Sequence, residues 1–113
     1  MTAMTFAFTM ARGNNLTQIA THIDGIASQT KRVCIVDTFV QQWLGSGGGS
    51  GIDYHVNFSC DGTSSSPKLS SSETHTNFEL VSVITKDMLT HKYELVGVQH
   101  PSKDSSTLTF ISR

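Results

Sequence analysis

The chain has 113 residues and a formal net charge of −1; 37% of its residues are hydrophobic and 15% are charged. Its eight lysines and arginines are scattered along the sequence, which argues against the clustered positive charge of proteins that bind nucleic acid or anionic membranes. No apolar run reaches the roughly 18 residues of a membrane span, and the sequence shows no signal-peptide pattern. We therefore expect a single soluble domain, 1–113, that is intracellular, either cytoplasmic or nuclear.

The first part of the chain predicts a strand followed by a helix. Met4, Phe6, Phe8 and Met10 alternate with small or polar residues, which is the pattern of a strand with one buried face. After turn residues at 12–15, apolar side chains recur at helical spacing at Leu16, Ile19, Ala20, Ile23, Ile26 and Ala27. The apolar stripe is narrow, so we expect this helix to pack on a sheet.

Residues 31–44 fit two patterns. Valine and isoleucine at four positions between 32 and 40 favour a strand there. The same segment also places apolar residues on one helical face, at Val36, Phe39, Val40, Trp43 and Leu44. We favour the strand, which then continues to Trp43 as a strand or as a short helical turn.

Residues 45–51 read GSGGGSG, and a tract of only glycine and serine between two apolar-rich segments indicates an engineered linker. Such a tract is a flexible coil suited to joining neighbouring chain ends. Three origins fit it: replacement of a long loop, a tethered fusion of segments 1–44 and 52–113, or a circular permutant. The sequence leaves these three open.

The segment after the linker is the clearest strand in the sequence. Its apolar residues alternate without exception with polar ones, at Ile52, Tyr54, Val56, Phe58 and Cys60. One face of this strand is therefore expected to be exposed to solvent. If the linker closes a hairpin, it joins this strand to the preceding one.

The last part of the chain predicts a loop and three strands. Residues 61–76 are rich in serine and threonine and have no aromatic residue, so we expect a flexible loop. Residues 77–85 and 92–100 are predicted as two strands of a further hairpin, and residues 107–111 as a final short strand. The predicted fold class is α+β, with one helix packed on a curved antiparallel sheet of five to six strands.

The ionisable residues indicate no catalytic or metal site. The five histidines have no close metal-ligand spacing, and neither cysteine belongs to a CxxC motif. His22 is expected to be a solvent-facing or edge residue of the helix. Cys34 and Cys60 are predicted to be free thiols packed as small hydrophobes; the alternative is a bridge between them, which requires their strands to be adjacent. We expect no cofactor, no metal and no enzymatic activity.

Three residues are the candidate binding residues: Trp43, Tyr54 and His55. Tryptophan is enriched among the residues that dominate protein interfaces. His55 lies on the face of the strand after the linker that is expected to be exposed to solvent, beside Asp53 and Asn57. These features favour a non-catalytic protein-protein interaction or regulatory module, whose partner is another protein or a peptide.

An alternative function is a pocket for a small molecule or lipid between the helix and the sheet. The side chains that motivate this reading are predicted on inward faces, at Phe6, Phe8, Met10, Tyr54 and Phe58.

Overall fold

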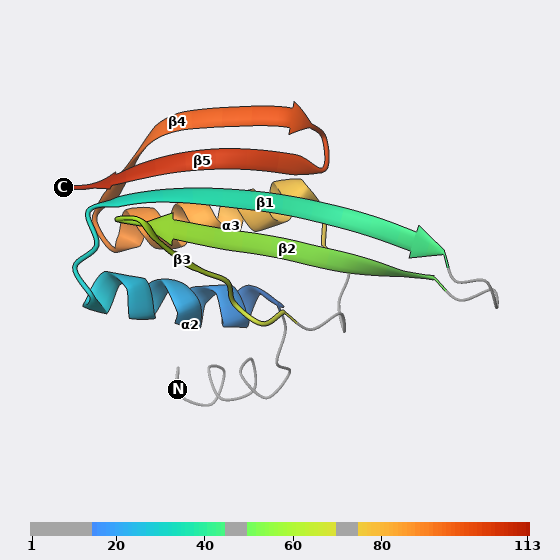
Figure 1. Ribbon diagram of the computed structural model, residues 1–113, viewed down its shortest axis with the longest axis horizontal. Coiled ribbons are helices and arrows are strands. Elements are labelled where there is room, and N and C mark those ends of the chain that lie inside the picture. The colour runs from blue at the N-terminus through green and yellow to red at the C-terminus, as the bar shows by residue number, and fades with distance from the viewer. Residues whose placement is uncertain (1–14, 45–49, 70–74) are drawn as a thin grey trace, which may run out of the picture.

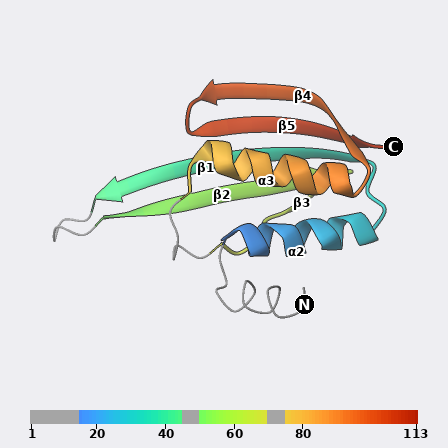
Figure 2. The same cartoon turned by 180° about the vertical axis from the view of Figure 1, so that it is seen from behind.

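The computed structural model describes residues 15–44, 50–69 and 75–113 (Figure 1). Their elements, in chain order, are α2 (Asn15–Ser28), β1 (Val33–Leu44), β2 (Ser50–Cys60), β3 (Thr63–Ser65), α3 (Asn77–Thr90), β4 (Tyr93–Ser102) and β5 (Ser105–Ser112). Figures 1 and 2 show both of these helices on one face of the sheet, so the fold has two layers. Neither helix is long and apolar enough to cross a membrane.

The sheet is antiparallel and has the strand order β3-β2-β1-β5-β4. β1 is the central strand, and its residues 34–44 pair with residues 50–60 of β2 in reverse order. On its other side, residues 33–39 of β1 pair with residues 105–111 of β5. The hairpin expected between the strands that flank the glycine-rich tract is therefore confirmed.

The predicted α+β class is confirmed, although the described residues contain two helices where one was expected. α2 lies where the apolar stripe predicted a helix, and the strands predicted over 52–60, 92–100 and 107–111 correspond to β2, β4 and β5. The ambiguous segment is a strand through Leu44, so the short helical turn near Trp43 is not formed. The strand predicted over 4–10 lies outside the described residues.

The prediction of a strand over 77–85 is wrong, because these residues form the first part of α3. The segment is rich in β-branched residues, which favour strands only in a suitable environment. Leu80, Ile84 and Met88 are spaced by four residues and are all fully buried, which is one face of a helix. The decisive member of this stripe is Met88, which lies beyond the segment assigned to the strand.

A capping box fixes the start of α3. The Thr76 hydroxyl accepts a hydrogen bond from the Glu79 backbone N–H at 3.1 Å, and the Glu79 carboxylate accepts one from the Thr76 N–H at 3.0 Å. These two bonds satisfy donors that otherwise lack an intrahelical partner. The N–H bond from Thr76 is the main reason why the pKa of Glu79 is lowered.

The segment 61–76 begins with regular structure. Asp61 and Gly62 both have positive φ, 50° and 85°, as a two-residue hairpin turn requires, and they join β2 to β3. The Asp61 carboxylate also accepts hydrogen bonds from the backbone N–H groups of Arg32 and Val33, each at 3.0 Å. Asp-Gly after a strand of alternating pattern is a sequence signal for a hairpin. The prediction of a loop relied on the serine and threonine content of the segment and did not use this signal. Within this segment, residues 70–74 lie outside the described part, as do residues 45–49 of the glycine-rich tract.

The core lies between the helices and the sheet. Both helices and β1, β2 and β5 supply fully buried side chains, the largest of which include Phe58, Phe110, Ile19, Ile23, Leu80, Ile84 and Leu108. Burial of each large aliphatic or aromatic side chain contributes roughly 1.5–3 kcal/mol.

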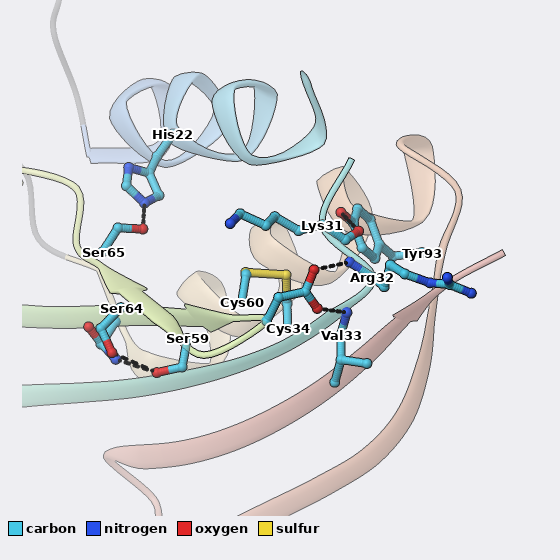
Figure 3. The surroundings of a disulfide bond; sticks show 12 residues. His22, Lys31, Arg32, Val33, Cys34, Ser59, Cys60, Ser64, Ser65 and Tyr93 are labelled. Atoms are coloured by element: carbon cyan, nitrogen blue, oxygen red, sulfur yellow. Dashed lines mark hydrogen bonds between the residues drawn. A yellow bond between two sulfur atoms is a disulfide. The ribbon is translucent and has the colours of Figure 1, made fainter. Parts of the chain in front are cut away.

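Cys34 and Cys60 form a disulfide between β1 and β2, so the prediction of free thiols is wrong (Figure 3). The two residues stand directly opposite each other in the register, with their Cα atoms 4.1 Å apart and both side chains buried. The pairing of β1 with β2 places the two cysteines on adjacent strands, which a bridge requires.

We predict that Ile23→Ala lowers the free energy of unfolding by roughly 2–5 kcal/mol, because Ile23 is fully buried and its removal leaves a cavity. The measurement is urea denaturation followed by circular dichroism. Thr21→Ala, at an exposed position of the same helix, is the control and should change stability by less than about 0.5 kcal/mol. Equal effects of the two changes would contradict the observed packing of α2.

We predict that the Cys34→Ala/Cys60→Ala double variant is less stable than the oxidised protein by roughly 3–4 kcal/mol. The bridge closes a loop with a sequence separation of 26, and a cross-link of this length restricts the unfolded chain by about that amount. Adding a reductant should destabilise the wild type similarly and leave the double variant unchanged. Alkylation of both cysteines in unfolded, non-reduced wild type would show that the bridge is absent.

Candidate functional site: the open face of the sheet

One face of the sheet carries no helix in the described part of the structure (Figures 1 and 2). Successive side chains of a strand point to opposite faces, and the buried residues of β1 are Cys34, Val36, Thr38 and Val40. The odd-numbered residues of β1 and their cross-strand partners therefore lie on the opposite side. We call this side the open face; it includes the odd-numbered residues among 33–41 of β1, 53–59 of β2 and 105–111 of β5.

An apolar strip crosses the two central strands on the open face. Val33, Ile35 and Phe39 of β1 are 41%, 40% and 41% exposed, and Ile111 of β5 is 43% exposed. Val33 and Ile111 are direct cross-strand partners, so the strip is continuous from β1 to β5 at this end. Exposed apolar side chains gathered on one sheet face are a common feature of surfaces that bind other molecules.

Phe39 is held by a ring contact with His55, its partner on β2. The two ring centroids are 5.8 Å apart, and the rings are nearly parallel with an interplanar angle of 24°. His55 is exposed, so this pair presents aromatic surface to solvent. Aromatic pairs of this kind stabilise adjacent strands and fix the orientation of the side chains involved.

Polar groups border the apolar strip, and Asp37 interrupts it between Ile35 and Phe39 on the same face of β1. The Thr107 hydroxyl donates a hydrogen bond to the Asp37 carboxylate at 2.7 Å, which links β5 to β1. Towards β3, the Asn57 amide donates to the Ser59 hydroxyl at 3.1 Å, and Ser59 lies 3.1 Å from the Ser64 hydroxyl. An apolar centre with a polar, solvated rim is the usual composition of a protein interface.

The open face is acidic among the described residues. By register it carries Asp37, Asp53 and Glu94, and Arg113 follows β5 at one corner. The Arg113 guanidinium lies 3.7 Å from the Glu94 carboxylate, so this arginine already forms an ion pair. The carboxylates that the register places beside Phe39 on the open face are Asp37 and Asp53, and it places no lysine or arginine between them.

Of the three residues predicted from the sequence, the structure describes the side chains of two, Tyr54 and His55. His55 lies on the open face, whereas Tyr54 points to the helix side, where its hydroxyl accepts a 2.7 Å hydrogen bond from the His75 backbone N–H. Trp43 pairs with Gly51 in the β1–β2 ladder, and its side chain lies outside the described part. The sequence reasoning missed Phe39, although the alternation of β1 carries the signal.

Several clefts lie elsewhere on the described part of the molecule, among them one beside each helix. One, of about 410 Å³, runs between α2 and β3, where the His22 ring lies 2.9 Å from the Ser65 hydroxyl and 5.0 Å from the Phe58 ring (Figure 3). His22 is therefore half-buried at an interface rather than solvent-facing. The other, of about 340 Å³, lies beside the start of α3 and is lined in part by His75 and Phe78. Neither cleft is lined by Tyr54 or Phe58, the described rings that motivated the small-molecule alternative.

A chain of hydrogen bonds joins α3 to the sheet. The Thr38 hydroxyl donates to the Asn77 side-chain oxygen at 2.6 Å, the Asn77 amide donates to the Ser106 hydroxyl at 2.8 Å, and Ser106 lies 2.7 Å from the His100 ring. Ser106 is only 2% exposed, so its hydroxyl is shielded from solvent. The chain serves to anchor the first turn of α3. No metal-binding group of three or more suitable side chains occurs among the described residues.

Comparison of the chain with protein-family models, curated proteins and solved structures found no match.

We predict that His22 makes stability fall as the pH drops from 7 towards 5. Burial lowers the pKa of His22 below its ordinary value of 6.5, so the unfolded chain takes up a proton before the folded one does. The contribution is fully present above pH 6.5 and is lost as the pH falls through the folded pKa. Urea denaturation at several pH values should show a smaller decrease for His22→Gln than for the wild type. Identical pH profiles would contradict this assignment.

Proposed function

We propose that this protein is a non-catalytic module that binds another protein through the open face of its sheet. The observation that supports this most strongly is the apolar strip formed by Val33, Ile35, Phe39 and Ile111 on the helix-free side. The same strands bury alternate residues under the helices, so the fold itself does not need apolar side chains on the open face.

Covering this strip supplies the energy for binding. Each side chain in it is already partly shielded by its neighbours, and a partner that buries the rest removes that apolar area from water at roughly 25 cal/mol per Å². The partner's contacts with the polar rim around Asp37 and Asn57 then exclude water from the centre. Of the predicted residues Trp43, Tyr54 and His55, the open face includes His55; Tyr54 lies on the helix side, and the side chain of Trp43 lies outside the described part.

The compartment we propose is an oxidising one. A buried disulfide between adjacent strands persists outside the reducing cytosol and nucleus, where the sequence alone placed the protein. This proposal concerns where the folded protein works and is independent of the partner that it binds.

We predict that peptides selected for binding will depend on the open face. A displayed library of random 15-residue peptides is panned against the immobilised protein, and enriched peptides are tested against Ile35→Glu and Ile111→Glu. These variants should bind at least about tenfold more weakly, because a charge at the centre of the strip opposes its burial. Leu89→Glu, at an exposed apolar position of α3, is the matched control and should bind normally.

Thermal unfolding of each variant verifies that the fold is retained. Failure to enrich any peptide, or enrichment of peptides that bind both open-face variants normally, would contradict the proposed function.

A further inference from the structure

The surroundings of Phe39 differ from the rest of the apolar strip. Asp37 lies two residues before Phe39 on the same side of β1, and Asp53 pairs with Gln41, diagonally across from Phe39 on β2. Neighbours along a strand face and across its diagonal lie about 7–8 Å apart, within reach of a long side chain. Phe39 is therefore an aromatic surface with a carboxylate on each of two sides.

The two carboxylates differ in their hydrogen bonding. Thr107 donates a hydrogen bond to one oxygen of Asp37, which orients that group. Asp53 is exposed, and the described residues give it neither a hydrogen bond nor an ion pair. The face thus offers one oriented carboxylate and one unpaired carboxylate beside an aromatic ring that His55 holds in place.

An arginine side chain matches this arrangement better than any other group. Its guanidinium is planar, stacks on aromatic rings, and donates paired hydrogen bonds to carboxylates while it stays charged. Lysine supplies the charge but neither the flat surface nor the paired donors. A nucleic acid is disfavoured here, because its phosphates would face Asp37 and Asp53.

A second copy of this chain is also a poor occupant. Two open faces packed together would bring the acidic groups of both copies into one interface, and like charges in an interface cost several kcal/mol. Charge complementarity instead requires a partner that is basic where it meets Phe39.

We propose that the partner presents an arginine to Phe39, bracketed by Asp37 and Asp53, with apolar side chains beside it that cover Val33, Ile35 and Ile111. This inference rests on the proposed function and specifies the chemistry of the partner. The apolar strip gives binding energy, while the acidic groups around Phe39 select for the arginine.

The test uses the peptides selected on the wild-type protein and shown to require Ile35. We expect arginine to be enriched in them, and synthetic versions are made with that arginine replaced by lysine or by neutral citrulline. Citrulline should weaken binding at least about tenfold, and lysine less, because lysine retains the charge.

Protein variants locate the arginine. Asp53→Asn should weaken binding of the arginine peptide about tenfold and change binding of the citrulline peptide little, which shows that the two charged groups interact directly. Phe39→Ala should weaken binding of both peptides, and that of the arginine peptide more, because it also removes the ring on which the guanidinium stacks. Asp24→Asn, at an exposed carboxylate on α2, is the matched control and should have no effect. Raising the salt concentration should weaken binding of the arginine peptide more than that of the citrulline peptide.

The two proposals fail separately. Peptides that require Ile35 but tolerate citrulline, or contain no arginine, overturn the arginine inference and leave the proposed function standing. Failure to select peptides that require the open face overturns both.

Discussion

The pairing of β1 with β2 on one side and β5 on the other is the interaction on which the rest of this structure depends. Through these ladders the central strand places Cys34 against Cys60, aligns the buried residues under the helices, and sets Phe39 beside His55. Because side chains alternate along a strand, one register decides both what enters the core and what remains on the open face. A slip of one residue would exchange these two sets.

The disulfide and the Asp61 turn reinforce the same register. The bridge joins β1 to β2 at one end of their ladder, and the Asp61 carboxylate holds the backbone of Arg32 and Val33 at the start of β1. On the helix side, Asn77 bonds to both Thr38 and Ser106 and so ties α3 to two neighbouring strands. The open face therefore belongs to a rigid part of the protein, which suits a surface that receives a partner without rearrangement.

In the complex that we propose, the apolar and acidic parts of the open face have separate physical roles. Val33, Ile35 and Ile111 offer area whose burial is favourable with many partners, so they contribute affinity with little discrimination. The carboxylates near Phe39 lose water on binding and recover that cost only from a cation in the right place. A surface of this kind selects its partner mainly through the groups around Phe39.

The sequence by itself determined the elements whose pattern is local. The stripe of α2 and the alternation of β2 follow from periodicity, and the α+β class follows from these elements. α3 was missed because β-branched residues and helical spacing compete in residues 77–85. The capping box of Thr76 and Glu79 and the burial of Leu80, Ile84 and Met88 favour the helix.

Tertiary structure alone decided the rest. The disulfide depends on two strands meeting in one register, a relation between residues 26 positions apart that no local pattern encodes. The candidate site depends on it in the same way, since Phe39, His55, Asp53 and Ile111 come from three strands. Local preferences specify how each segment folds, but long-range pairing and the side on which the helices pack determine which side chains are left to meet a partner.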